Sequence, residues 1–217
     1  ISEIGAGSFA VRQHDIHLPE LIFTVIQGLK PRIEKAGLNL GVMVTNRDRL
    51  TVLGDDRRLQ WATGHLLDNC VKYTETGGEI MLRLGRIRDR YMLIEVSDTG
   101  VGIHPDDLPH DFERFYRGTA RDTSGKVIDP RGLGQGLFVA RAVAEAHGGY
   151  LSVASSVGEG STFTLALPLG GKNGSKAPRP TAPRPTMPAA PPEMPPPPDI
   201  IEPPPDMFSS TQRRLRS

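Results

Sequence analysis

The chain has 217 residues, 37% of them hydrophobic, and its 26 basic and 25 acidic side chains give a formal charge of +1. Such a chain buries one sizeable core, and its near-zero charge provides no global field to attract nucleic acid or anionic lipid. The longest apolar run is far shorter than a membrane span, and the first residues lack the charged, then apolar, then small-residue pattern expected of a signal peptide. The single cysteine, Cys70, excludes an internal disulfide framework and a multi-cysteine metal site. We therefore expect a soluble protein whose function comes from local sites.

Proline divides the chain into two regions. Fourteen of the twenty prolines lie between Pro178 and Pro205. Such a segment lacks the amide donors and the apolar mass that a packed core needs, and it samples extended polyproline II conformations. We therefore expect the folded domain to end near Gly170 and residues 171–217 to form a disordered Pro-rich tail. A spacer, or a docking segment for an aromatic-grooved partner, is the alternative for this tail.

Helical and strand patterns alternate in the first half of the domain. Apolar residues recur at helical spacing from Leu18 to Lys35, and Gly37 follows as a helix stop. Residues 40–44 are a short strand candidate. Residues 55–74 predict a second helix, which a pair of turn glycines closes.

Strand signals dominate the second half, with one further helix among them. Apolar and polar residues alternate in residues 80–84 and again in residues 92–96, with a charged hairpin between. Residues 136–147 predict a third helix, ended by two glycines where a left-handed cap is wanted. Strands over residues 150–155 and 161–167 follow. Few helices and about five strands predict an α/β fold, a two-layer α/β sandwich whose mixed sheet is covered by helices on one face.

One face of the second predicted helix is polar. His65, Asn69, Lys72 and Tyr73 stand at i, i+4, i+7 and i+8 and therefore form one stripe. An amide oxygen one turn from a lysine and an aromatic ring suits a hydrated magnesium ion, a phosphate oxygen and the edge of a base. The alternative is a solvated helix face, because short patterns match by chance.

Two glycine-rich segments follow. Asp98 ends an apolar strand and is followed by Gly100 and Gly102. A carboxylate there suits an exocyclic amine, and the glycines let the backbone turn beside a flat ring; a plain turn is the alternative. Gly132 to Gly136 opens the third helix, whose free amides favour a polyphosphate. A dinucleotide-binding fold needs a strand before such glycines, whereas a long polar loop precedes these.

Taken together and in order, these segments closely resemble the ATP-binding catalytic domain of sensor histidine kinases. That family shares the GHKL, or Bergerat, fold with gyrase, chaperone and mismatch-repair ATPases. The resemblance covers roughly residues 1–169 and carries several ordered motifs. They are the asparagine motif His65–Thr74, the first glycine motif Asp98–Ile103, the phenylalanine motif Phe112–Arg117, the second glycine motif Gly132–Gly136 and the closing motif Gly158–Phe163.

The resemblance implies roles for individual residues. Asn69 would coordinate Mg2+ and Lys72 would contact phosphate. Both would act in catalysis together with Arg117, which would contact the phosphates or the transition state. Tyr73 would lie beside the adenine of ATP, and Asp98 would accept a hydrogen bond from its amino group. The implied ATP-binding set is completed by Gly100, Gly102, Ile103, Gly132, Leu133, Gly134, Gln135, Gly136, Leu137 and Thr162.

Three features qualify the resemblance. The segment between Phe112 and Gly132 has few apolar anchors, and in this family it would be a mobile lid over ATP. Leu133 and Gln135 stand where the family usually has a small and an aliphatic residue, so lid closure or phosphate geometry would differ. His65 stands where the family has asparagine or histidine, and it either hydrogen-bonds the water shell of the metal or is only a helix-face histidine.

The phosphate-accepting hairpin of such kinases is missing from the sequence. In the acceptor hairpin, the phosphorylated histidine is followed by an acid and then a proline. His14, with Asp15 and Pro19 after it, matches this pattern, but only 55 residues separate His14 from Asn69. These residues already supply a helix and a strand of the ATP-binding domain, so two further helices of about 25 residues each do not fit. By the resemblance, residues 1–15 are the end of a dimerisation helix or a linker, and residues 16–170 are the ATP-binding domain.

The resemblance implies a protein histidine kinase that uses ATP and Mg2+. It would transfer the γ-phosphate to a histidine on the missing dimerisation hairpin, for relay to the receiver domain of a response regulator. It also implies a homodimeric parent, the cytoplasmic catalytic part of a membrane-anchored sensor, no nucleic-acid partner, and no activity of this chain alone. Two alternatives stay open. One is a serine kinase of the anti-sigma type, which the phenylalanine motif and the long lid disfavour; the other is a non-catalytic nucleotide sensor in which Leu133 or Gln135 prevents lid closure.

Overall fold

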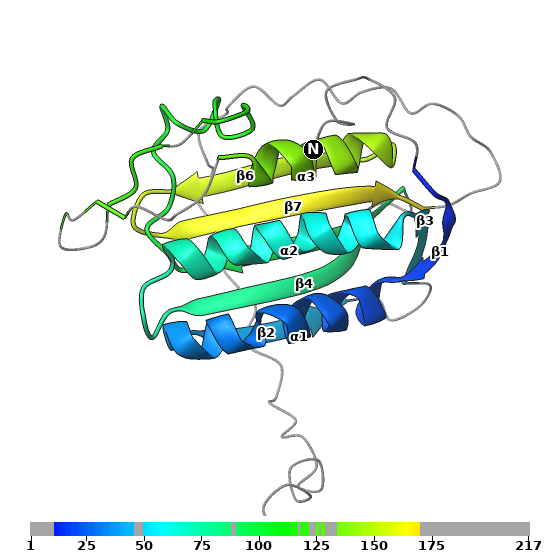
Figure 1. Cartoon of the computed structure of the whole chain (residues 1–217), viewed down its shortest axis with the longest axis horizontal. Helices are drawn as coiled ribbons and strands as arrows, with labels where there is room; N and C mark the ends of the chain where they lie inside the picture. The colour runs from blue at the N-terminus through cyan, green and yellow to red at the C-terminus, as the bar shows by residue number, and fades with distance from the viewer. Residues whose placement is uncertain are drawn as a thin grey trace, which may run out of the picture. The chain divides into compact units, whose positions relative to one another are not determined.

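The computed structural model describes residues 11–45, 50–87, 90–116, 118–121, 125, 127, 128 and 134–169. The chain divides into two units, residues 1–177 and 178–217, and every described residue lies in the first. The described residues form three helices and seven strands (Figure 1). Residues 1–10 and the tail predicted at 171–217 lie outside the described residues. Within the described part of the chain, no helix combines the length and the apolar content that crossing a membrane requires.

A five-stranded mixed sheet forms one layer of the domain. Its strands lie in the order β2-β4-β5-β7-β6, with β2 parallel to β4 and every other neighbouring pair antiparallel. The five strands are β2 (Asn39–Val44), β4 (Glu79–Ile87), β5 (Tyr91–Asp98), β6 (Tyr150–Ser156) and β7 (Gly160–Pro168). The two-layer α/β sandwich expected from the sequence is confirmed.

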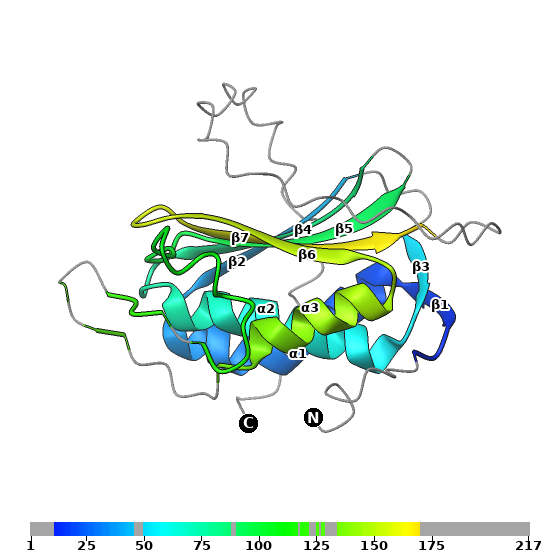
Figure 2. The same cartoon turned by 90° about the horizontal axis from the view of Figure 1, so that it is seen from above.

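Three helices form the second layer, all on one face of the sheet (Figure 2). They are α1 (Leu18–Ala36), α2 (Asp56–Tyr73) and α3 (Gly136–Ala146), and α2 packs between the other two. The carboxylate of Asp55 caps α2 by accepting the backbone N–H of Arg58 at 3.2 Å. Gly37 ends α1 with a φ of +66°, a left-handed conformation that favours glycine. The helix limits expected from the sequence agree with these to within one residue.

The core lies between the sheet and the helices. Every second residue of β4 and β5 points toward the helices, because successive side chains of a strand alternate between faces. These residues meet the apolar face of α2, and full burial of a leucine or isoleucine contributes about 1.5–3 kcal/mol. The contact set includes Ile80, Leu82, Leu84, Met92, Ile94, Val96, Leu59, Leu66 and Leu67, all buried.

A second, two-stranded sheet lies at one end of the domain, and the sequence patterns do not predict it. Strand β1 (His14–His17) pairs antiparallel with β3 (Thr51–Gly54). Each strand has four residues and buries only a small apolar surface, chiefly Ile16 and Val52, so alternation is too short to detect. His14, whose sequence context resembles that of an acceptor histidine, lies in β1 opposite Gly54 and not on a helix. The strand also starts two residues before residue 16, where the domain was expected to begin.

Candidate functional site

The candidate site lies where the end of α2, the loop after β5 and the start of α3 meet. Gly136 at the start of α3 lies against the ring of His65, because an added Cβ would stand 3.1 Å from its Nδ1. The backbone N–H of Val101 donates to the carbonyl of Tyr73 at 3.1 Å. Asn69 is half-buried on the helix between these two contacts. The fold therefore brings three of the predicted motifs together.

Asp98 is a buried carboxylate at the end of β5. Its Oδ1 accepts the backbone N–H of Gly100 at 2.9 Å, and the carboxylate also accepts the thiol of Cys70 and the backbone N–H of Ser161. Burial raises the pKa of Asp98 above its ordinary value, and these three hydrogen bonds oppose the rise. Asp98 is therefore a desolvated acceptor with fixed orientation. The thiol contact was not anticipated from the sequence, since residues on a helix and at a strand end meet only in the folded chain.

The closing glycine motif holds the first glycine motif in place. The N–H of Gly158 donates to the carbonyl of Val101 at 2.9 Å, and the N–H of Ile103 donates to Oγ of Ser155 at 2.8 Å. Gly160 has a φ of +103°, and a Cβ there would overlap the carbonyl oxygen of Asp98. Only glycine fits this crossing of two backbones, so the turn between β6 and β7 fixes the loop that carries Asp98.

Ser161, and not the predicted Thr162, lies on the Asp98 side of the sheet. In the register of β5 and β7, Ser161 stands opposite Asp98 and Thr162 opposite Ser97. Phe163, two residues after Ser161, belongs to the core beneath the helices, so alternation places Thr162 on the opposite face of the sheet. The Oγ of Ser161 lies 3.0 Å from the Oγ of Ser155. The sequence alone does not show which of the two neighbouring hydroxyl residues, Ser161 or Thr162, lies beside Asp98; the strand register does.

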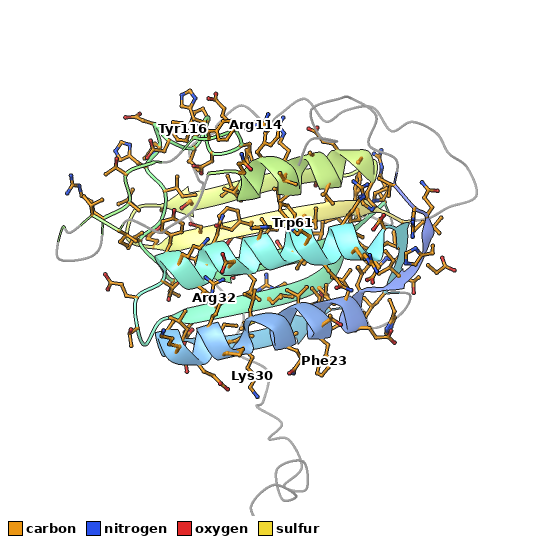
Figure 3. The ribbon with its side chains drawn as sticks, viewed as in Figure 1. Phe23, Lys30, Arg32, Trp61, Arg114 and Tyr116 are labelled. Atoms are coloured by element: carbon orange, nitrogen blue, oxygen red, sulfur yellow. The ribbon has the colours of Figure 1, made fainter. Side chains whose placement is uncertain are left out.

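The phenylalanine motif reaches the second glycine motif. The N–H of Phe115 donates to the carbonyl of Gly134 at 3.0 Å, and Phe115 has a φ of +69°, an uncommon conformation for a residue with a side chain. The hydroxyl of Tyr116, which is labelled in Figure 3, donates to Asp107 on the loop that leads into the motif, at 2.5 Å. Burial, with the charge of Asp107, raises the pKa of Asp111 to about 6.

Lys72 forms an ion pair within its own helix. Its Nζ lies 2.7 Å from Oδ2 of Asp68, and Arg32 of α1 contacts the other oxygen of the same carboxylate. Sequence reasoning passed over Asp68, although an acid four residues before a lysine on a helix is a recognisable pairing signal. The predicted phosphate contact of Lys72 therefore starts from a side chain that already has a partner.

His65 packs against the single tryptophan. The rings of Trp61 and His65, both on α2, are 3.8 Å apart between centroids, and Figure 3 labels Trp61. Burial lowers the pKa of His65; the charge of Asp68 opposes this, and that of Lys72 adds to it. The neutral ring therefore fills the space beside the start of α3, which leaves both sequence interpretations of His65 open.

Part of the predicted set lies outside the described residues, namely Arg117, Gly132 and Leu133. The remaining members of the second glycine motif stand at the start of α3, where Gln135 is the N-cap residue and Gly136 and Leu137 begin the helix. The first backbone N–H groups of a helix are free to bind an anion. Gln135 makes no side-chain capping bond to them.

Comparison with known proteins assigns these motifs to a family. The family described as "Histidine kinase-, DNA gyrase B-, and HSP90-like ATPase" matches residues 54–171. The circadian input-output histidine kinase CikA of Synechococcus elongatus is 32% identical over 192 residues, which cover 88% of this chain and 24% of CikA. The sensor histidine kinase RppB of Synechocystis sp. is 40% identical over 116 residues, which cover 54% of this chain and 24% of RppB. The chain thus spans about a quarter of the length of these curated relatives.

Solved structures show the same fold. Full-length ShkA in complex with AMPPNP superposes with a TM-score of 0.65 at 25% identity, covering 76% of this chain and 33% of ShkA. The mycobacterial sensor histidine kinase MprB superposes with a TM-score of 0.61 at 27% identity, covering 72% of this chain and 97% of that structure.

Proposed function

We propose, from the premise that the chain belongs to the family of histidine kinase-, DNA gyrase B- and HSP90-like ATPases, that it is the ATP-binding catalytic domain of a two-component sensor histidine kinase. The observation that carries the proposal is the buried carboxylate of Asp98, which three hydrogen bonds hold beside the end of α2. The names of its relatives, CikA and RppB, support the histidine kinase class.

Adenine recognition falls to groups at the end of β5. Asp98 accepts the amino group of the base, Tyr73 lies beside the ring, and the hydroxyl of Ser161 takes the place first assigned to Thr162. A hydrogen bond to a charged acceptor contributes about 1.5–3 kcal/mol, and guanine, which has a carbonyl oxygen at C6 where adenine has its amino group, would set an acceptor against this desolvated carboxylate. Selection of adenine over guanine follows from that difference.

Phosphate binding falls to α2 and the start of α3. The amide oxygen of Asn69 is a hard ligand of the kind that Mg2+ prefers, and Mg2+ keeps most of its remaining positions for water and phosphate oxygens. When bound, the ion neutralises charge on the phosphates. Helix α3 begins at Gly136, beside the ring of His65, and the free N–H groups of a first helical turn suit an anionic oxygen. The residues present therefore fit Mg·ATP.

In phosphoryl transfer, this chain positions ATP and stabilises charge, and none of its own side chains forms a covalent intermediate. A ring nitrogen of the acceptor histidine attacks the γ-phosphorus, the bond to the β,γ-bridging oxygen breaks, and ADP leaves as the phosphohistidine forms. Lys72 and Arg117 stabilise the charge on the transferring group. The acceptor is supplied by the dimerisation hairpin of a homodimeric parent, and the phosphoryl group then passes to the receiver domain of a response regulator.

Nucleotide binding by the full chain is the first test. Calorimetric titration with ATP should show binding that strengthens with Mg2+, and Asp98→Ala should weaken it at least about tenfold, because the adenine acceptor is lost. Asn69→Ala should weaken binding only when Mg2+ is present. Glu34→Gln on the exposed side of α1 is the control and should leave the affinity unchanged. A folded wild-type chain that binds no ATP would overturn the proposal.

Transfer is the second test. Adding a separately expressed dimerisation hairpin with its histidine should give acid-labile phosphate on that hairpin. Acid-stable phosphoserine on a partner would instead assign the chain to the serine kinases. ATP binding without transfer to any hairpin would assign it to the non-catalytic nucleotide sensors.

A further inference from the structure

We propose that Arg32 of α1 is a positioning residue for Lys72, because it neutralises Asp68 when Lys72 leaves that carboxylate for the phosphates of a bound nucleotide. This inference rests on the proposed function and adds to it a residue from outside all five motifs. It makes α1 part of the phosphate-binding machinery.

The three side chains form a shared ion pair between two helices. Lys72 contacts Oδ2 of Asp68 at 2.7 Å from the next turn of α2, and the guanidinium of Arg32 reaches Oδ1 from α1. Figure 3 shows Arg32 directed from α1 toward α2. Each cation thus occupies one oxygen of a single carboxylate.

The burial of Asp68 makes its ion pairs with both cations important. The side chain of Asp68 is 12% exposed, whereas those of Lys72 and Arg32 are 26% and 51% exposed. A carboxylate so far removed from water is costly to leave without a cation, and breaking a buried pair by removing one partner is strongly destabilising. Without Arg32, Asp68 would hold Lys72 and compete with any phosphate for it.

The two cations suit different halves of this exchange. Lysine is a compact charge on a flexible four-carbon stem, so the ammonium of Lys72 can turn from Asp68 to a phosphate oxygen without moving α2. Arginine is a planar fork whose charge is permanent, so Arg32 keeps Asp68 neutralised from the neighbouring helix. When nucleotide binds, Arg32 therefore stays paired with Asp68, and Lys72 moves to a phosphate oxygen of the ligand.

A charge-specific binding measurement tests the inference. Arg32→Gln in the full chain should weaken Mg·ATP and Mg·ADP about fivefold, the size expected of a partly exposed ion pair. Adenosine has no phosphate, and its affinity should be unchanged. Lys30→Gln is the matched control, since it removes an equal charge from α1 at an exposed position where Lys30 pairs with Glu34. Arg32→Lys should retain most of the nucleotide affinity.

A second variant separates release of Lys72 from simple damage to the fold. Arg32→Gln combined with Asp68→Asn removes both the cation and the carboxylate that traps Lys72, and nucleotide affinity should return to the wild-type value or above. An equal loss for adenosine, a double variant as weak as Arg32→Gln, or an unchanged affinity of Arg32→Gln would each overturn the inference. A wild-type chain that binds neither adenosine nor nucleotide would instead overturn the proposed function itself.

Discussion

Asp98 shows how one side chain combines burial with a fixed orientation. Its carboxylate accepts the amino group of adenine best when it is ionised, yet burial favours the protonated form. Three donors, the N–H of Gly100, the thiol of Cys70 and the N–H of Ser161, offset only part of that cost. The affinity for adenine is thereby linked to pH through a carboxyl group whose pKa is raised, so binding should weaken as pH falls through the raised value.

Replacement of Cys70 tests this balance. In Cys70→Ala the carboxylate loses a donor that lowers its pKa, so the pKa of Asp98 rises further and ATP binding should fail at a higher pH than in the wild type. Cys70→Ser restores a hydroxyl donor and should return the midpoint toward the wild-type value. The measurement is ATP affinity against pH for the three proteins. A midpoint that does not move in Cys70→Ala would show that the thiol does not tune Asp98.

The two hydroxyls after Gly160 give a second prediction at this scale. Ser161→Ala should weaken ATP binding about two- to fivefold, because it removes a hydroxyl hydrogen-bonded beside Asp98. Thr162→Ala changes the opposite face of the sheet and should leave the affinity as it is. Titration of both variants decides between them, and a larger loss in Thr162→Ala would restore the assignment made from the sequence.

The order of the motifs in the sequence predicted which segments meet at the candidate site, and the structure brings three of them together; the roles of their single residues stay predictions. Asn69, Asp98 and Gly136 each stand in a motif, and the motifs follow one another in the order typical of the family. Neither Cys70 nor Arg32 could be found in this way. Their roles depend on which residues of other elements lie opposite them, and no local spacing encodes that.

At the scale of elements, His147 joins the end of α3 to the start of α2. Its Nε2 accepts the N–H of Asp55 at 2.9 Å, and its Nδ1 donates to the carbonyl of Val143 at 2.7 Å, so both bonds are made only by the neutral ring. Gly54 passes directly beside this ring, where an added Cβ would lie 2.7 Å from its Cδ2. The contact therefore ties β3, α2 and α3 together at the end of the domain opposite the site.

Lowering the pH should weaken the contacts of His147 and reduce the stability of the domain. Burial lowers the pKa of His147 in the folded chain; the bond to Val143 and the charge of Asp55 oppose this, and the charge of Arg58 adds to it. The unfolded chain therefore takes up the proton first, and the stabilisation is fully present above about pH 6.5 and lost as pH falls below it. His147→Ala should cost about 1–3 kcal/mol at pH 8, since the N–H of Asp55 loses its partner, and should flatten the pH dependence of stability.

Denaturant unfolding at several pH values measures the effect. His104→Gln, which changes an exposed histidine, is the control and should keep the wild-type slope. A slope in His147→Ala equal to that of the wild type would show that the ring is not the titrating group.

The elements themselves were predictable where a periodic pattern runs long enough. The three helices and the five strands of the main sheet carry such patterns, and their limits follow from caps such as Asp55 and Gly37. The pairing of β1 with β3 was not predictable, since it joins two four-residue segments across α1 and β2. Contacts between segments so distant in sequence are set by the packing of everything between them.

At the scale of the whole molecule, the core that the described residues form lies within the first of the two units of the chain. The buried apolar cluster runs from Ile16 to Leu167, and β7 ends at Pro168. All residues proposed to bind nucleotide lie within these limits. The tail therefore has no assigned part in ATP binding, whatever its role in the longer protein.

Deletion of residues 171–217 tests that separation. The shortened chain should keep its ATP affinity to within about twofold and its unfolding midpoint unchanged, because no core or site residue is removed. Calorimetric titration and thermal unfolding of the shortened and full chains, side by side, provide the comparison. A large loss of affinity with an unchanged midpoint would show that the tail contributes to the nucleotide site, and a lowered midpoint would show that it packs on the domain. Equal values for both chains would leave the tail free for a partner or for a spacer between domains.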